Sequence, residues 1–569
     1  MPPGNVLSYL EELCARIDDL ERRIAALEIV SSARTTQTQS SKILTAHNLH
    51  PVEAQPASLT PSLFSILGRS ILGIAGAYLF RAAAESRVLP TGIVLRLALA
   101  YAAGWLVWAA WSGTKSRIAL HAYAVTAALI LSPMLWEITV RFKLFAPGVS
   151  AAVLAGFAGL AVALGWRFQV SPVIWTGMLA SSITSLALMI GTRTLVPFTW
   201  ALLFMAALTE IGTSRGRWHG LRPVVAAAAD SAAFILIVIL GNAGAIPAEY
   251  HAERTDVLLA LVLSLWAIYA VSLAVRSLRF HEKVSVFDIS QSLATALLAG
   301  WAVLRITHGG GLRVLGIFCL IVGAACYLAM LSLFARHGER RNVRFYGVCG
   351  LAFVVAGSFW TLPHLPLVVW LCTAAAIATG AGVRSRNPAL DIHGVAYLCA
   401  ALYASGLLEY AGRALAGASA PLPDVLQIVT ATAAVLCAVL LSRYPGERTA
   451  ERLLRILPVV VAVYATAGLA VSGLVWLIAR AATPALSQLA VIRTIVTGAA
   501  ALGLACIGAQ WKRLELVWLA YAATVLGGLK LVIEDLRIGS TQSLAVSLVI
   551  FGAVLILIPR LVRTGKRPA

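Results

Sequence analysis

The sequence predicts an all-α protein, a polytopic membrane domain of about 18 transmembrane helices preceded by a short cytosolic coiled coil. Of its 569 residues, 60% are hydrophobic and 12% charged, against roughly 45–50% and 25% in soluble domains. The hydrophobic residues form long continuous runs, and the basic residues between them are concentrated in every second loop. Because so large an apolar excess must face lipid, the composition excludes an ordinary soluble globular protein.

Residues 1–28 carry a heptad pattern that predicts a coiled-coil helix. Arg16 and Arg23 would face Glu21 and Glu28 of a partner helix, so the pattern favours a parallel homodimer through residues 6–28. The alternative is a single amphipathic helix lying along its own membrane domain, because three heptads are near the lower limit for a stable coil. The apolar seam consists of Val6, Leu10, Leu13, Ile17, Leu20, Ile24 and Leu27.

Residues 29–61 are rich in Ser, Thr, Gln, Ala and Pro and show no sustained period, which predicts a flexible polar linker. The N-terminus lacks a basic start followed by an apolar run, so we expect no cleaved signal peptide. The remaining residues, 62–569, form the transmembrane domain and a short basic C-terminal tail.

This domain contains 18 apolar runs, each near the roughly 20 residues that a helix needs to cross a bilayer. A transmembrane β-barrel is excluded because the runs are continuous rather than alternating. The approximate limits are 62–83, 91–111, 118–140, 147–166, 173–191, 195–212, 224–245, 257–275, 286–304, 314–335, 345–361, 365–383, 391–411, 424–441, 456–479, 484–508, 515–534 and 541–559. The weakest separation is the short segment TLPHLP between 345–361 and 365–383.

The loop charges predict the orientation. Loops after even-numbered runs, together with the C-terminal tail, hold 25 of the 45 Lys and Arg residues, and loops after odd-numbered runs hold 10. Cytoplasmic loops are enriched in Lys and Arg, so both termini are expected in the cytoplasm of a bacterial cell with the domain in its inner (plasma) membrane. The formal charge of +20 is then explained largely by the basic residues of the cytoplasmic loops, and no nucleic-acid partner is needed to explain it.

The chain lacks the motifs of several chemistries. It has no phosphate-binding G-x-x-x-x-G-K-[ST], no H-E-x-x-H zinc helix and no G-x-S-x-G nucleophile elbow. No two histidines have metal-ligand spacing, and the aromatic residues do not alternate with Lys and Arg. We therefore expect no cofactor, no metal, no catalytic residue and no nucleic acid.

The informative residues are charges inside the apolar runs, because each costs roughly 2.5–3.5 kcal/mol at membrane depth and usually has a partner or a water path. Seven of them share the outer leaflet and could converge on a polar cavity that binds a polar or anionic group. The alternative is local pairing and snorkelling, as between Lys530 and Glu534. The seven are Arg81, Arg96, Glu137, Glu409, Lys530, Glu534 and Asp535. Asp230 and Arg493 are expected to be isolated charges.

Both ends of the transmembrane domain, together with the heptads, resemble an uncharacterised bacterial family of predicted polytopic membrane proteins with an N-terminal coiled coil. The resemblance implies a long train of helices and a lysine-bearing helix with an acidic exit near the end. It implies no activity and adds no catalytic residue. The matching residues are Gly68, Gly73, Gly76, Arg81, Glu85, Pro90, Lys530, Asp535, Ser547 and Gly552.

These observations favour a transport-like or envelope-associated membrane protein, rather than an enzyme, that binds or moves a polar substrate through intramembrane charges. The first alternative is a non-catalytic scaffold oligomerised by its coiled coil, and the second is a transferase acting on a lipid-linked substrate. Internal helix-pair repeats would favour a transporter. Gly- and Ala-rich spans recur along the chain, but no fixed period is apparent.

Overall fold

A computed structural model describes residues 59–86, 90–113, 116–215, 220–241, 246–335, 339–417, 422–442, 449–479, 485–538 and 541–564. Within these ranges every regular element is a helix, so the fold is all-α. The predicted coiled coil at 1–28 lies outside the described residues, and so does all of the predicted linker except 59–61. Those three residues already belong to the first described helix, which begins at Leu59.

The helices follow one another with short connections, and three of them continue into a five-residue π-helical turn. The order is α2 (Leu59–Glu85), α3 (Thr91–Ser112), α4 (Arg117–Trp136), η1 (Glu137–Arg141), α5 (Pro147–Phe168), α6 (Ser171–Thr192), α7 (Val196–Thr213), α8 (Arg222–Leu240), α9 (Thr255–Ala274), η2 (Val275–Arg279), α10 (Val286–Ile306), α11 (Leu312–Ala335), α12 (Arg340–Thr361), α13 (His364–Ser385), α14 (Pro388–Ser405), α15 (Leu407–Ala416), α16 (Val425–Ser442), α17 (Thr449–Ala479), α18 (Leu486–Gln510), α19 (Leu514–Lys530), η3 (Leu531–Asp535), α20 (Leu536–Ile538) and α21 (Thr541–Thr564).

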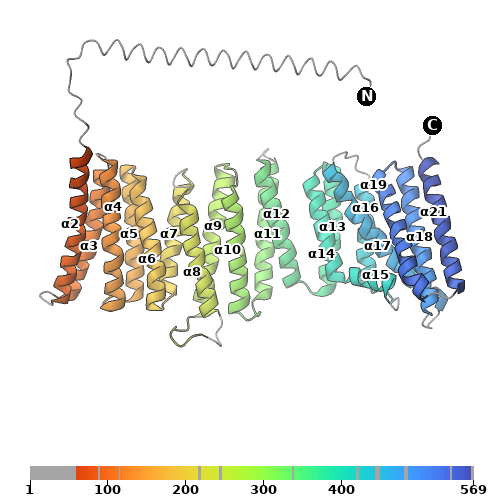
Figure 1. The fold of residues 1–569 in the computed structure, drawn as a ribbon, viewed down its shortest axis with the longest axis horizontal. Helices are drawn as coiled ribbons and strands as arrows, with labels where there is room; N and C mark the ends of the chain where they lie inside the picture. The colour runs from red at the N-terminus through yellow and green to blue at the C-terminus, as the bar shows by residue number, and fades with distance from the viewer. Residues whose placement is uncertain are drawn as a thin grey trace, which may run out of the picture.

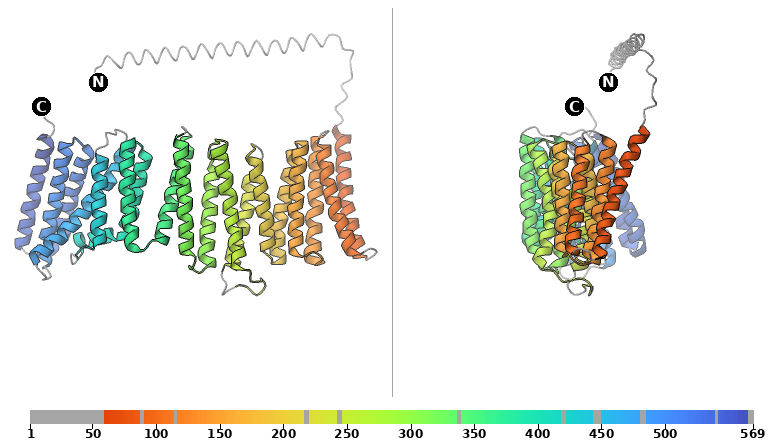
Figure 2. Two further views of the ribbon diagram at one scale, coloured as in Figure 1. Left: turned by 180° about the vertical axis from the view of Figure 1, so that it is seen from behind. Right: turned by 90° about the vertical axis from the view of Figure 1, so that its left-hand side faces the viewer.

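The long helices stand side by side in an elongated slab, with α2 at one end and α21 at the other (Figures 1 and 2). Successive long helices run in opposite directions, because the short connections return the chain at the same face. We call the face at which α2 begins and α21 ends the start face, and the other the opposite face. The N-terminal end of α2 and the C-terminal end of α21 therefore both lie at the start face (Figure 1).

Seventeen described helices are long and apolar enough to cross a membrane, and the bent pair α14 and α15 brings the number to as many as 18. The predicted count is confirmed. The two helices of the bent pair meet at an angle of 66°, so the predicted run 391–411 is not one straight helix. Gly406 separates them in a left-handed conformation with φ of 64°, which glycine adopts without a steric penalty. The helices at 340–361 and 364–385 are separate, as predicted.

The slab exposes side chains that a soluble protein would bury. Leu297 on α10, for example, is 63% exposed, and similarly exposed Ile, Leu and Val residues occur on most helices. Such a surface is stable against hydrocarbon, and helices suit this environment because their backbone groups pair within the segment. The protein is thus a multi-pass membrane protein.

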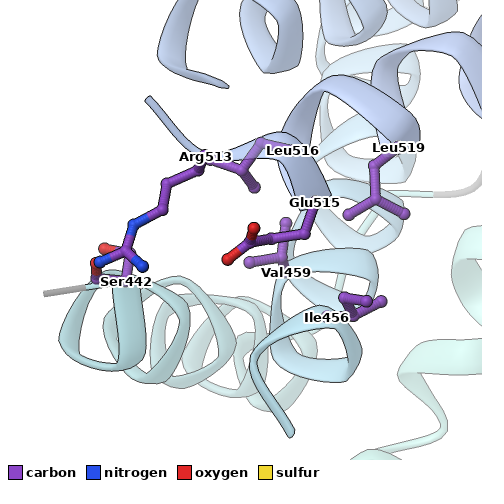
Figure 3. A pocket seen from close by; sticks show the side chains of 7 residues that line it. All are labelled: Ser442, Ile456, Val459, Arg513, Glu515, Leu516 and Leu519. Atoms are coloured by element: carbon purple, nitrogen blue, oxygen red, sulfur yellow. The ribbon is translucent and has the colours of Figure 1, made fainter. Parts of the chain in front are cut away.

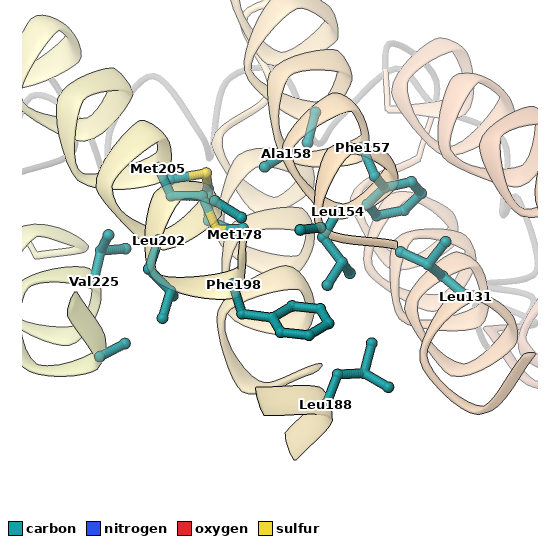
Figure 4. Packing of buried hydrophobic residues seen from close by; sticks show 14 of the residues in the cluster. Leu131, Leu154, Phe157, Ala158, Met178, Leu188, Phe198, Leu202, Met205 and Val225 are labelled. Atoms are coloured by element: carbon teal, nitrogen blue, oxygen red, sulfur yellow. The ribbon is translucent and has the colours of Figure 1, made fainter. Parts of the chain in front are cut away.

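Two large apolar cores lie within the slab. The first runs from Ala77 to Ile306 across α2–α10, and the second from Val354 to Ala465 across α12–α17. Figure 4 shows part of the first core, where Phe198 and Leu202 on α7 pack near Leu154 on α5. Small residues are frequent in both cores, which lets neighbouring backbones approach closely.

Helices α11 and α12 border the second core and approach each other closely at glycines. A Cβ atom added at Gly357 would lie 2.7 Å from the carbonyl oxygen of Gly316 and 2.9 Å from the backbone nitrogen of Leu320. One added at Gly323 would lie 3.0 Å from the backbone nitrogen of Val354. These distances leave no room for a side chain, so the glycines set how close the two helices come.

Gly357→Ala is expected to destabilise the protein by about 1–3 kcal/mol, because the added methyl group must push two backbones apart. The matched control is Gly300→Ala on α10, where no atom lies within 4 Å of the added Cβ. That change should be neutral or stabilise the protein by up to about 1 kcal/mol. Thermal unfolding of the two purified variants checks the difference, and equal melting temperatures would contradict the close contact.

Candidate functional site

Three clusters of ion pairs join helices that are distant in the sequence, and each includes residues of one π-helical turn. Such turns are rare and occur frequently at functional sites. We call the clusters by their elements: the α2–η1 cluster (Arg81, Glu85, Glu137 and Arg141), the α7–η2 cluster (Glu210, Arg222, Arg276 and Asp288) and the α18–η3 cluster (Arg493, Lys530, Glu534 and Asp535).

The α2–η1 cluster lies at the opposite face, where α2 and α4 end. Arg81 Nη1 is 2.9 Å from Glu137 Oε1, and Arg141 Nη1 is 3.0 Å from Glu85 Oε1. Arg81 and Glu85 also pair within α2 at 3.4 Å. Except for Glu137, these side chains are a third or more exposed, so the cluster ties the ends of two helices together near the membrane surface.

The α7–η2 cluster is the most deeply buried of the three, since each of its four charged side chains is at most 6% exposed. The Arg222 guanidinium at the start of α8 binds Glu210 on α7 through two bonds, Nε to Oε1 at 2.8 Å and Nη2 to Oε2 at 3.0 Å. The same Nη2 donates to Asp288 Oδ1 on α10 at 2.9 Å. This two-pronged geometry is the one in which arginine holds a carboxylate most tightly.

A second arginine completes the cluster from η2. Arg276 Nη2 donates to Asp288 Oδ1 at 2.6 Å and lies 3.9 Å from Glu210 Oε2. Ser272 donates its hydroxyl to Glu210 Oε2 at 2.5 Å, and Ser285 forms a capping box with Asp288 at the start of α10. Two arginines and two carboxylates therefore balance each other inside the slab near the start face.

Local structure places Arg276 in this cluster. The π-helical turn carries α9 on through residue 279, so Arg276 lies inside the bundle rather than in a loop. Ser277 on the same turn bonds Tyr346 of α12 at 2.6 Å. Asn342 of α12 accepts from the backbone of Val284 at 2.9 Å and donates to the carbonyl of Glu282 at 2.8 Å. Helix α12 thus fixes the connection between η2 and α10.

Asp230 on α8 has an amide partner rather than a basic one. Gln291 Nε2 on α10 donates to both carboxylate oxygens, at 3.0 and 2.9 Å. Gln291 lies three residues after Asp288, on the same buried face of α10. In the part of the chain that the structure describes, no Lys, Arg or His nitrogen lies within 4.0 Å of the Asp230 carboxylate.

The α18–η3 cluster lies at the opposite face and corrects one expectation. Arg493 is not isolated, because its Nη1 is 2.5 Å from Glu534 Oε1. Its Nε and Nη2 donate to the carbonyl oxygens of Ala414 and Gly417, at 2.8 and 2.5 Å. These carbonyls belong to the C-terminal end of α15, where a positive charge is stabilised by the helix dipole. The bend at Gly406 brings this helix end to Arg493.

The other half of this cluster centres on Lys530. Its ammonium donates to Asp535, to Thr494 Oγ1 at 2.7 Å and to the carbonyl of Ala490 at 2.6 Å. Thr494 also donates to Asp535 at 2.9 Å, so three groups satisfy one another in a buried setting. Glu534 lies 3.6 Å from Lys530, one turn along the same helix.

The seven charges predicted to share one cavity occupy separate places. Arg81 and Glu137 lie at the α2 end of the slab, and Lys530, Glu534 and Asp535 lie near its α21 end (Figure 1). Arg96 on α3 is exposed, and Glu409 on α15 is an exposed partner of Arg413. Although all seven belong to helix ends at the opposite face, the length of the slab separates them, so they do not line one cavity.

The α7–η2 cluster was not anticipated from the sequence. Arg222 and Arg276 count as cytoplasmic loop charges when runs are delimited by hydropathy alone. Glu210 and Asp288 lie within the apolar runs at 195–212 and 286–304. These two carboxylates inside apolar runs are the sequence feature that could have indicated a buried charge cluster. Only the fold shows that four helix ends bring these charges together.

A separate pocket lies between the ends of α16, α17 and α19 at the start face (Figure 3). Ile456, Val459, Leu516 and Leu519 supply most of its lining. Arg513 reaches across to donate to the carbonyl of Ser442 at 3.1 Å. The pocket contains none of the buried ion pairs, and its lining is that of an apolar packing gap near the membrane surface.

Comparisons of the chain with protein-family models, with curated proteins and with solved structures give no match. The protein is a polytopic helical membrane protein with buried charge clusters. Within the chain itself, the segment around η1 corresponds to the segment around η2.

Helices α4 and α9 are both 20 residues long, and each continues into a five-residue π-helical turn. After each turn comes a phenylalanine and then a residue with positive φ, Lys143 at 50° and His281 at 55°. The backbone hydrogen bonds correspond as well: the phenylalanine nitrogen bonds the first π-helical carbonyl, at 2.8 Å after η1 and at 3.3 Å after η2.

The correspondence extends to side chains and to direction. Thr139 in η1 and Ser277 in η2 each donate to the carbonyl four residues earlier at 2.7 Å, and each turn ends in an arginine, Arg141 or Arg279. Helix α4 runs from the start face to the opposite face, whereas α9 runs the other way (Figure 1). The two matching units therefore run in opposite directions across the slab, and we call α4–η1 and α9–η2 the inverted pair.

Proposed function

We propose that this protein is transport-like and that it binds or moves an anionic solute through the α7–η2 cluster. The observation that carries the proposal is the burial of Glu210, Arg222, Arg276 and Asp288 within a lipid-exposed slab. Taking a charged group out of water into a protein interior costs several kcal/mol, which its ion-pair partners must offset. Helix packing alone does not require this cost, since apolar residues of similar size pack at least as well.

The chemistry of the cluster favours a carboxylate- or phosphate-bearing solute. Two guanidinium groups meet at Asp288, and Arg222 presents a fork that already holds a carboxylate. A carboxylate or phosphate of a solute could pair with these arginines in place of Glu210 or Asp288, and the displaced carboxylate would then need a proton or a new partner. The inverted pair of α4–η1 and α9–η2 agrees with the same proposal, because many secondary transporters are built from segments of opposite direction, there as repeats of several helices.

Thiol accessibility tests the proposal without knowledge of the solute. A transport path needs water on the buried face of α10, so Thr295→Cys should react with a charged, membrane-impermeant thiol reagent. The matched control is Leu297→Cys, which lies two residues away on the same helix and is 63% exposed to lipid. A thiol in lipid does not ionise readily, so this variant should remain unreactive.

The experiment uses full-length protein in lipid bilayers, with its eight native cysteines replaced by alanine. A reactive Thr295→Cys beside an unreactive Leu297→Cys is the expected result. Two unreactive thiols would contradict a transport path at the cluster and would favour a scaffold instead.

The proposal also covers the membrane, the orientation and the partners of the protein. The excess of Lys and Arg in loops at the start face supports a cytoplasmic location for both termini in a bacterial inner membrane. The heptads at 6–28 support a homodimer, and the residues matched at both ends of the domain support membership of the uncharacterised polytopic family. A lipid-linked substrate would be an alternative ligand for the arginines.

A further inference from the structure

We propose that Asp230 binds and releases a proton inside the membrane, with Gln291 as its partner in both protonation states. The proposal deepens the proposed function, on which its physiological meaning rests, by naming the proton as the coupled ion. Proton binding itself can be measured whether or not a solute is transported.

The depth of Asp230 is the first step. It lies eight residues after Arg222, at which α8 begins, so it is about 12 Å along the helix axis from that end. The whole helix of 19 residues is about 28 Å long. Asp230 is therefore close to the middle of the membrane, whereas the α7–η2 cluster is near the start face.

The charges around Asp230 do not neutralise it. Arg222 and Arg276 are both engaged with Glu210 and Asp288, and α6, which also packs against α8, contains no charged side chain. The titratable and charged groups of the packed elements are Glu210 on α7, Arg222 on α8, Asp256 and Tyr269 on α9, Arg276 and Arg279 on η2, and Asp288 and Arg305 on α10.

The amide partner suits a group that changes its protonation state. An ionised Asp230 accepts hydrogen bonds from Gln291 Nε2, as the distances of 3.0 and 2.9 Å show. A protonated Asp230 can donate to Gln291 Oε1 after the amide turns over, because the two ends of an amide are a donor and an acceptor. A lysine or arginine here would have held the carboxylate ionised, and a leucine would have left it without a donor.

A proton fits this site better than a metal ion. The Gln291 nitrogen occupies the space in front of both carboxylate oxygens, where a cation would need oxygen ligands. Among the described residues, no group of three or more His, Cys, Asp or Glu side chains is placed to hold a metal. In the proposed step a proton from water adds to one Asp230 oxygen and gives the neutral acid, and release reverses this without any other bond changing.

The site lies close to the α7–η2 cluster along α10. Gln291 is one helical turn beyond Asp288, whose carboxylate lies among Arg222, Arg276 and Ser285. A charge change at Asp230 would therefore be felt one turn away by the arginines proposed to hold the solute. This adjacency is the physical basis for coupling the two events.

Infrared difference spectra of the full-length protein in lipid bilayers, recorded across a pH titration, test the proposal. The parent protein should show a carboxylic-acid carbonyl band that grows as the pH falls, and Asp230→Asn should lack this band. Asp256→Asn is the control, because Asp256 is exposed at the start of α9 and pairs with Arg254. It should retain the band of Asp230.

Two further variants keep the test decisive. Gln291→Leu removes the donor to the ionised form, so the midpoint of the band should move about one unit to higher pH. Asp230→Glu keeps an acid at the site and should shift the band rather than abolish it, even if Asp230→Asn folds poorly. The proposal would be overturned if the pH titration of the carboxylic-acid band were the same in Asp230→Asn and Asp230→Glu as in the parent protein. It would also be overturned if the band of the parent protein did not change with pH. Reactivity of Thr295→Cys in the same samples reports separately on the transport path.

Discussion

The Arg222→Leu variant is expected to have a free energy of unfolding about 3–5 kcal/mol lower than that of the parent protein. Arg222 makes two bonds to Glu210 and one to Asp288, all within 3.0 Å and all buried. Removing it leaves two carboxylates in a low-dielectric interior with Arg276 as the remaining cation. The change can be measured as a fall in the thermal unfolding temperature of purified protein in detergent.

Arg254→Leu is the matched control for this result. Arg254 also binds a carboxylate with two nitrogens, that of Asp256, but both side chains are more than half exposed. Exposed pairs contribute about 0–1 kcal/mol, so this variant should unfold close to the parent. Similar losses in the two arginine variants would show that burial of the α7–η2 cluster is not what makes Arg222 important.

The Arg493→Leu variant is also expected to lose about 3–5 kcal/mol of its free energy of unfolding. The change leaves the carbonyls of Ala414 and Gly417 without their donor and leaves Glu534 with only Lys530, at 3.6 Å. Because these carbonyls end α15, the loss should be concentrated in that helix. Hydrogen exchange followed by mass spectrometry should show faster exchange of the α15 amides, together with a lower unfolding temperature.

Arg413→Leu separates this effect from a general loss of charge on α15. Arg413 pairs with Glu409 four residues earlier, and both side chains are mostly exposed. Its replacement should change the exchange of α15 by little. If Arg413→Leu and Arg493→Leu accelerate exchange equally, Arg493 does not anchor the helix end.

Much of the fold could be predicted because hydropathy and loop charge act locally. Each span is a continuous apolar run, and the sequence places the separate helices at 340–361 and 364–385 correctly. The bend between α14 and α15 could not be predicted in this way. Gly406 lies in an apolar run, and its positive φ becomes visible only when the chain turns there.

The charge clusters were harder to predict than the spans. Lys530, Glu534 and Asp535 are neighbours in the sequence, so their pairing was foreseeable. The partners of Arg493 lie on α15 and η3, and only the packing of helices brings them to it. Hydropathy ends the predicted run at residue 275 and so places Arg276 in a loop. The π-helical turn, which hydropathy does not reveal, continues the helix through residue 279 and keeps Arg276 inside the bundle.

The elongated slab also determines how much lipid the protein contacts. For a given number of spans, a long outline has a greater perimeter than a round one, so more annular lipids border each molecule. The exposed Ile, Leu and Val side chains along its length are the surface that these lipids cover. Such a protein is expected to immobilise more lipid per helix than a compact bundle, which spin-labelled lipids can measure, and to be sensitive to membrane curvature along its long axis.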